Sequence, residues 1–243
     1  MTSSRTRLAI LLMIICITLS LAIGVGSLIS TGARLRSELI TALSAPTLLV
    51  TFLDPIAMAL EFIAVILVFS ESRRIGGLQR TLASLALGFL IAWLILNFGA
   101  FLPTSLLGLS TGSVEAVRLG LIIKSSAAIL QYLIPLFLIY GVAEPLERRI
   151  LIPASTLTVA GNFLLTLLPI WSVKIIPTSL AGGARIYRPL IEVDYLSQPY
   201  LTLLITGYLG GILYLAAYIS TYIKLRSLQR PSRSIRITPY VSR

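Results

Sequence analysis

Residues 118–153 read RLGLIIKSSAAILQYLIPLFLIYGVAEPLERRILIP, and this stretch decides the fold. Its first part is apolar over a membrane-spanning length, yet it carries Lys124, Gln131 and Pro135 before a charged turn. A transmembrane helix needs about 20 mainly apolar residues. A lysine inside such a helix is costly unless it has a partner or reaches water. We therefore expect a membrane protein in which another helix supplies a partner for Lys124.

The composition of the whole chain agrees with this expectation. Of its 243 residues, 56% are hydrophobic and 12% are charged, and the mean hydropathy is +0.94. Such a chain is too apolar for a soluble domain. We predict an all-α polytopic membrane protein, a bundle of about six transmembrane helices in a single domain over 1–223, with a basic cytoplasmic tail over 224–243. The apolar runs place the helices at about 8–28, 46–69, 82–101, 117–142, 150–171 and 200–223.

Several classes of site are excluded by residue content. The chain has no histidine and one cysteine, Cys16, which excludes His-ligated haem, ordinary zinc chemistry, Ser/His proteolysis and an intrachain disulfide. No phosphate-binding P-loop is present, so nucleotide-driven work would need another polypeptide. We expect no enzymatic activity, no cofactor and no metal.

The basic residues predict the orientation in the membrane. With the N-terminus inside, thirteen lysines and arginines fall on the cytoplasmic side and six outside, which favours N-in and C-in by the positive-inside rule. Residues 30–44 are predicted to form a short interfacial helix, and residues 172–198 a polar loop. The net charge of +11 indicates contact with anionic lipid of the cytoplasmic membrane in the first place, and with nucleic acid only in the second.

Four polar residues on the second and fourth predicted helices lie at matching depths. At 1.5 Å per residue, Asp54 and Lys124 lie about 12 and 10 Å from the starts of their helices, and Glu61 and Gln131 both lie about 21–22 Å from them. Each pair within a helix is about two turns apart and so shares a face. We predict that Asp54 pairs with Lys124 and that Glu61 hydrogen-bonds Gln131.

These intramembrane polar residues have more than one interpretation. Asn97 and Asn162 are expected near the Asp54–Lys124 level. The pair either holds the bundle together or forms part of a hydrated path for an ion, a proton or a polymer. A further alternative has Lys124 extending outward to the headgroups.

The last predicted helix carries two patterns of packing. Gly207 and Gly211 have the GxxxG spacing that lets another helix approach closely. Tyr214, Tyr218 and Tyr222 recur on one face, a pattern that favours helix packing ending in the interfacial aromatic belt over stacking of nucleic-acid bases.

Arginines gather at the predicted cytoplasmic surface. Arg148 and Arg149 stand on the turn within 144–149, and Arg230, Arg233 and Arg236 lie in the tail. They are candidates for docking anionic lipid, an acidic partner or DNA phosphates.

The segment 135–141, PLFLIYG, is followed by a short turn with Arg148 and Arg149 and by an apolar helix that ends in LLP at 167–169. Over about residues 131–170 this resembles the polytopic inner-membrane channel subunit of type IV secretion and conjugation systems, the TrbL-like family, and within it the archaeal DNA-import proteins of the CedA kind. The resemblance implies a membrane channel for single-stranded DNA. It also implies as partners a separate cytoplasmic ATPase and small membrane subunits. Further copies of the same chain are another candidate partner.

A rival interpretation comes from the loop after the second predicted helix. Residues 71–84, ESRRIGGLQRTLAS, loosely resemble the corresponding loop of six-helix ABC exporter permeases. An ABC permease or an ion-coupled small-solute transporter is therefore the alternative function.

Overall fold

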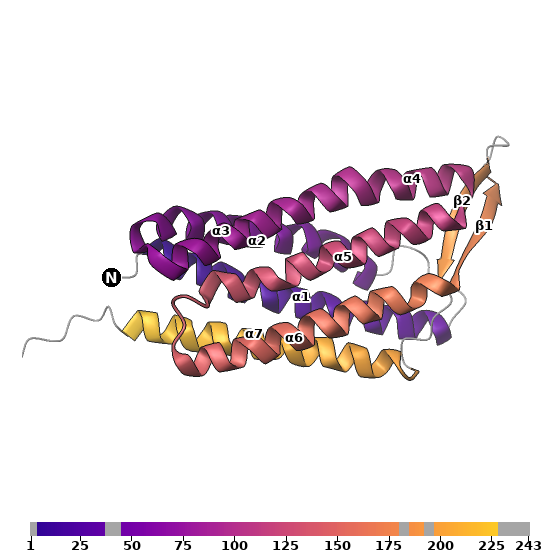
Figure 1. The fold of residues 1–243 in the computed structure, drawn as a ribbon. Coiled ribbons are helices and arrows are strands. Elements are labelled where there is room, and N and C mark those ends of the chain that lie inside the picture. The colour runs from indigo at the N-terminus through magenta and orange to yellow at the C-terminus, as the bar shows by residue number, and fades with distance from the viewer. Residues whose placement is uncertain (1–3, 37–44, 180–184, 192–196, 228–243) are drawn as a thin grey trace, which may run out of the picture.

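The computed structural model describes residues 4–36, 45–179, 185–191 and 197–227, which form a bundle of long helices with a small β-hairpin at one end (Figure 1). Within these residues, six helical stretches are long and apolar enough to cross a membrane. The prediction of an all-α polytopic membrane protein is thereby confirmed.

In chain order the elements are α1 (Ser4–Arg36), α2 (Ala45–Ile75), α3 (Gly77–Leu94), the π-helical η1 (Ile95–Phe101), α4 (Leu102–Thr111), α5 (Val114–Ile139), α6 (Pro145–Leu167), the 3-10 helix η2 (Leu168–Ser172), β1 (Val173–Ser179), β2 (Arg185–Ile191) and α7 (Tyr200–Ser227).

The two ends of the bundle differ. α1 begins and α7 ends at the same end, which we call the terminal end, and β1 and β2 lie at the opposite end, which we call the hairpin end (Figure 1). The ends of these two helices thus lie on one side, as predicted. The arginines predict that the terminal end is cytoplasmic.

Small residues bring the helices together. α1 packs against α2 and α7, α6 against α7, and α3 against α2 and α5. Each of the six long helices contributes an alanine with no exposed surface, and these are Ala9, Ala64, Ala83, Ala127, Ala154 and Ala217. Close approach at small side chains is how helices associate in lipid, where helices gain little hydrophobic energy from contact.

The glycines of α7 have the predicted packing role. A side chain on Gly207 would meet Asn162 of α6, and a side chain on Gly161 of α6 would meet the Gly207 backbone. Gly211 instead faces Leu21 of α1. The GxxxG pair therefore packs α7 against two helices at once.

The third span is longer than predicted. It was expected to end near Pro103, but helical structure continues from Gly77 to Thr111 over 35 residues, about 52 Å at 1.5 Å per residue. Pro103 falls in the first turn of α4, directly after η1, where a missing backbone N–H costs little. The helix ends instead at Gly112, whose φ of 71° suits a glycine. Because the hydrocarbon core is about 30 Å thick, this span extends beyond it.

Two predicted connections also differ from the structure. The segment expected to be a polar loop contains the antiparallel pair β1–β2, in which Val173 lies opposite Ile191. Arg118 of α5 anchors the start of this region, since its guanidinium donates to the Trp171 carbonyl oxygen at 3.1 Å. The interfacial helix predicted over 30–44 is not separate at its start, because α1 is continuous to Arg36; residues 37–44 lie outside the described residues.

Candidate functional site

A cavity of about 370 Å³ lies between α1, α2, α5, α6 and α7, and we call it the central cavity. Most of its wall is apolar, as expected from helices that also face lipid. The polar side chains that line it, other than tyrosines, are Cys16, Ser20, Glu61, Gln131, Thr158 and Asn162. Glu61 is the charged residue among the lining residues.

Glu61 and Gln131 meet across this cavity, as predicted from their depth. Gln131 Nε2 donates to Glu61 Oε2 at 3.1 Å, and the Glu61 side chain is 5% exposed. Glu61 shares a buried helix face with Ala57 and Ala64, which are at helical spacing from it. Small neighbours on α2 thus leave room for the carboxylate, and Gln131 of α5 supplies its hydrogen bond.

The predicted pair of Asp54 and Lys124 is wrong. Both residues are exposed, and no ion pair joins these two described side chains. Lys124 Nζ instead lies 5.4 Å from the centroid of the Phe101 ring. The reason is the long third span, because η1 and α4 continue along α5 and place Phe101 beside the lysine. The alternative in which Lys124 extends outward agrees with its exposure.

The two predicted asparagines have different environments. Asn162 lines the central cavity and donates to the Thr158 carbonyl oxygen of its own helix at 2.8 Å. Asn97 does not line it and donates to the Trp93 carbonyl oxygen at 2.9 Å, on the same helical stretch. Of the six polar residues predicted, Glu61, Gln131 and Asn162 come together at one cavity.

Two tyrosines close the central cavity toward the terminal end. Tyr214 Oη donates to the Tyr132 carbonyl oxygen at 3.0 Å, and Tyr218 Oη donates to the Pro135 carbonyl oxygen at 2.7 Å. Tyr218 has no exposed surface. The tyrosine face of α7 therefore packs on α5, as the helix-packing interpretation of this pattern predicted. These hydrogen bonds join the two helices just beyond the cavity.

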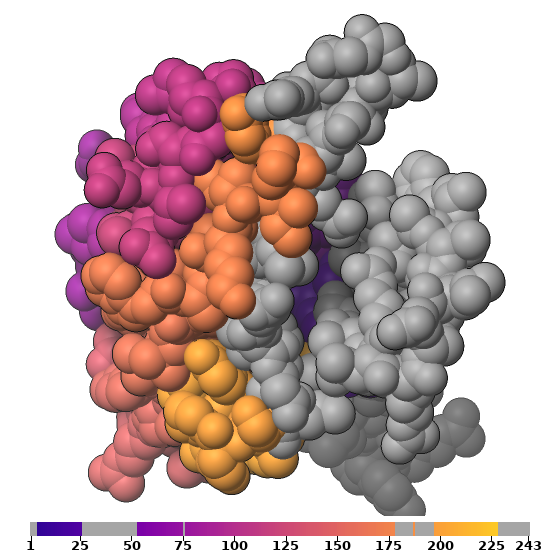
Figure 2. Space-filling model, turned by 90° about the vertical axis from the view of Figure 1, so that its right-hand side faces the viewer, coloured from indigo at the N-terminus to yellow at the C-terminus, as the bar shows by residue number. Residues whose placement is uncertain are grey.

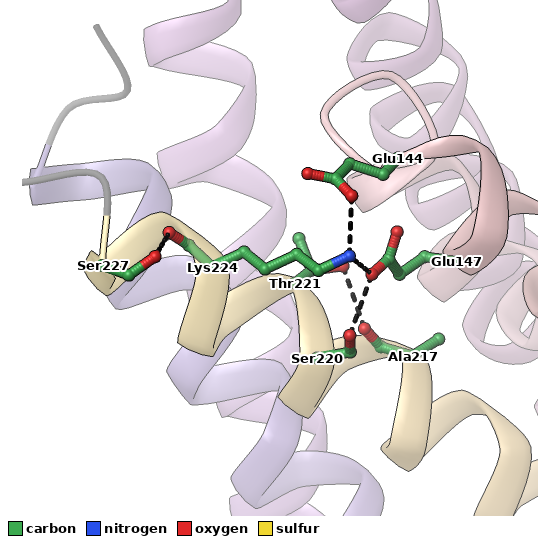
Figure 3. Close-up of polar contacts among 7 residues, drawn as sticks. All are labelled: Glu144, Glu147, Ala217, Ser220, Thr221, Lys224 and Ser227. Carbon is green, nitrogen blue, oxygen red and sulfur yellow. Dashed lines mark hydrogen bonds and ion pairs between the residues drawn. The ribbon is translucent and has the colours of Figure 1, made fainter.

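A cluster of ionic contacts at the terminal end was not predicted. Lys224 Nζ lies 2.7 Å from Glu144 Oε2 and also bonds Glu147 Oε1 (Figure 3). Ser220 Oγ donates to the same Glu147 oxygen at 2.8 Å. The sequence prediction placed Lys224 in the basic tail over 224–243. The signal of this cluster in the sequence is that Ser220 and Lys224 lie one turn apart on one helix face, while Glu144 and Glu147 stand at the N-cap and in the first turn of α6.

The arginines predicted to dock a partner differ in their exposure. Arg148 is half-buried, and its guanidinium donates to the Gly141 carbonyl oxygen at 3.4 Å and lies 5.4 Å from the Tyr140 ring centroid. It therefore supports the α5–α6 turn, and its role in docking stays a prediction. Arg149 is exposed at the same end. Arg230, Arg233 and Arg236 lie outside the described residues.

No protein-family model, curated protein or solved structure matches this chain. The site must therefore be interpreted from its own chemistry. Across residues 4–36, 45–179, 185–191 and 197–227, no group of three or more metal-binding side chains is found. The chemistry that the central cavity offers is that of one carboxylate, an amide, hydroxyls and aromatic rings in apolar surroundings. Such a set suits a cation or a proton as its ligand.

Proposed function

We propose that this chain is the membrane-embedded component of a transport system in the cytoplasmic membrane, and that its solute path includes the central cavity beside Glu61. The observation that carries this proposal is the nearly buried Glu61 carboxylate at the cavity wall. Ionisable groups at such depth are expensive in a membrane and usually serve a path or a site.

The extent of the central cavity supports a path from the hairpin end. Its lining on α7 runs from Leu204 to Tyr214, about 6 to 21 Å from the start of that helix at Tyr200. In the view onto the hairpin end, indigo atoms of α1 are visible beyond the orange surface (Figure 2). Beyond Tyr214 the tyrosine contacts and the Lys224 cluster join α7 to α5 and α6. A cavity closed toward one end is what one state of an alternating-access cycle requires.

A DNA-import channel remains a second candidate. The resemblance over 131–170 favours it, and so do the exposed arginines at the terminal end, which are Arg73, Arg74, Arg80, Arg149 and Arg226. The central cavity does not suit a polyanion, because Glu61 lines it and no lysine or arginine of the described residues does. In this candidate, single-stranded DNA passes between copies of the chain, with a separate ATPase and small membrane subunits.

Water access to the central cavity tests the proposed path. Ser20 lines the cavity and is exposed to it, whereas Ala22 is exposed without lining it and lies nearer the hairpin end of α1. We would compare Ser20→Cys and Ala22→Cys, each in a Cys16→Ala background, in lipid nanodiscs with a hydrophilic methanethiosulfonate reagent. Because the thiolate reacts and forms in water, the proposal predicts that Ser20→Cys reacts about tenfold or more faster. Equal rates, or faster reaction at Ala22→Cys, would rule out an aqueous path.

The two candidate functions are separated in cells. Deleting the gene should abolish exchange of chromosomal markers between cells if the chain carries DNA. Unchanged exchange would eliminate the DNA candidate and leave the small-solute transporter or ABC permease. An adjacent gene for an ABC ATPase would then favour the permease.

A further inference from the structure

We propose that Glu61 is a binding site for amphipathic organic monocations, such as protonated alkylamines or arylalkylamines, which reach it from the bilayer through a groove between α2 and α3. This inference rests on the proposed function and names the solute class for its cavity. It starts from the position of Glu61, which lines two hollows at once.

The second hollow, which we call the lateral groove, has a volume of about 430 Å³ and lies between α2 and the α3–η1 segment. Its wall is mainly apolar and includes three aromatic side chains, which are Phe62, Trp93 and Phe98. Phe62 is 41% exposed and Phe98 is 59% exposed on the outer surface of the bundle. The groove is thus lined by side chains suited to contact with hydrocarbon, and Glu61 stands at its inner wall.

The charge at this position is not balanced by a cation of the described residues. Among the described residues, no lysine or arginine forms an ion pair with Glu61, and Glu61 is the one charged side chain lining the central cavity and the lateral groove. Its hydrogen bond comes from a neutral amide. A buried carboxylate is costly unless a cation or a proton neutralises it, so the site calls for a positive ligand.

The surrounding side chains select the kind of cation. A metal ion such as Ca²⁺ takes six to eight oxygen ligands, and no such cluster is found in the described part of the chain. Aromatic faces attract organic cations, and Tyr132 and Tyr208 stand on the cavity side as Trp93 stands on the groove side. The Tyr208 hydroxyl is buried with no hydrogen-bond partner, so its oxygen is available to the positive end of an organic cation.

The size and route also fit this class of solute. A volume of about 370 Å³ is at the lower end of sites that hold small organic ligands. An amine with an apolar body enters a bilayer because water is removed from its apolar surface. From there the lateral groove leads to Glu61, which lines it.

The experiment measures binding of benzyltrimethylammonium to the full-length protein in nanodiscs of neutral lipid, with empty nanodiscs as background. Its uncharged isostere neopentylbenzene has the same shape. We expect saturable binding of the cation, weaker by about tenfold or more for the isostere and for Glu61→Gln. Glu115→Gln, which removes an exposed acid at the hairpin end, should bind as the wild type does. Glu61→Asp keeps the charge and should keep the preference for the cation, which separates loss of charge from loss of fold.

The route is tested by filling the groove. Ala59 lines the lateral groove, so Ala59→Trp should slow both association and dissociation of the cation while Kd changes little, because the site itself is unaltered. Ile66→Trp alters an exposed position on the same helix outside the groove and should leave both rates unchanged. Unchanged rates in Ala59→Trp would overturn the groove as the route.

Two outcomes separate this inference from the proposed function. Equal binding of cation and isostere, or undiminished binding by Glu61→Gln, would overturn the cation site even if Ser20→Cys reacts rapidly with the thiol reagent. Cation binding without reaction at Ser20→Cys would support the site and overturn the aqueous path.

Discussion

Glu61 and Glu147 are both buried carboxylates, 5% and 1% exposed, but their polar partners differ. Glu147 has Lys224 and Ser220 on one oxygen, at the end of the bundle where α6 and α7 meet. Glu61 lies in the middle of the bundle and receives one hydrogen bond from Gln131. A neutralised acid joins two helices, whereas an acid without a counter-ion is left available to a ligand. This difference is the basis for assigning a structural role to one and a binding role to the other.

The largest effect on stability is expected from removing Lys224, the cation that pairs with Glu147. Lys224→Met leaves that carboxylate buried without its partner, which is strongly destabilising. We predict that the midpoint of thermal unfolding in detergent, followed by circular dichroism, falls by about 5 °C or more. Arg226→Met removes an exposed cation two positions further along α7 and should change the midpoint little. A similar fall in both variants would show that the Lys224 contacts have no special role.

An effect of intermediate size is expected from neutralising the two acids, since the change in the free energy of unfolding should have opposite signs at Glu147 and Glu61. Glu147→Gln should lower the free energy of unfolding by about 1–2 kcal/mol because it weakens a charged hydrogen bond. Glu61→Gln should raise it by about 1 kcal/mol because it removes an uncompensated buried charge. Denaturant or thermal unfolding of the two variants under one set of conditions measures this. If both substitutions destabilise equally, Glu61 is a structural residue like Glu147.

The smallest effect is expected at Glu144, which is the exposed partner of Lys224, with its side chain 61% exposed. Surface ion pairs contribute little to stability, so Glu144→Gln should leave the unfolding midpoint within the scatter of the measurement. A fall as large as that of Glu147→Gln would mean that the cluster acts as a unit, and that burial does not decide the strength of each contact.

The sequence predicted one level of polar contacts and missed the other for a physical reason. Counting depth along straight helices placed Glu61 beside Gln131, and the hydrogen bond between these two long side chains agrees with that count. The same count failed for Asp54 and Lys124, because the third span passes Pro103 and brings Phe101 against α5. A proline in the first turn after a π-helical segment looks, in sequence, like a helix end.

The remaining parts of the site depend on contacts between distant segments. The Lys224 cluster joins α7 to residues 77–80 positions earlier, and no local pattern specifies that pairing. The lateral groove and the central cavity are spaces between helices, so they follow from packing angles and not from any single helix. Helix number and approximate bounds, in contrast, follow from apolar length alone.

The most direct test of the Glu61 site combines its two properties, access to water and attraction of a cation. The reaction rate of Ser20→Cys with the hydrophilic thiol reagent would be measured in nanodiscs with and without benzyltrimethylammonium, once with Glu61 present and once in Glu61→Gln. The account predicts that the cation slows the reaction by about tenfold or more when Glu61 is present and has no effect in Glu61→Gln. Equal slowing in both proteins, or none in either, would contradict it.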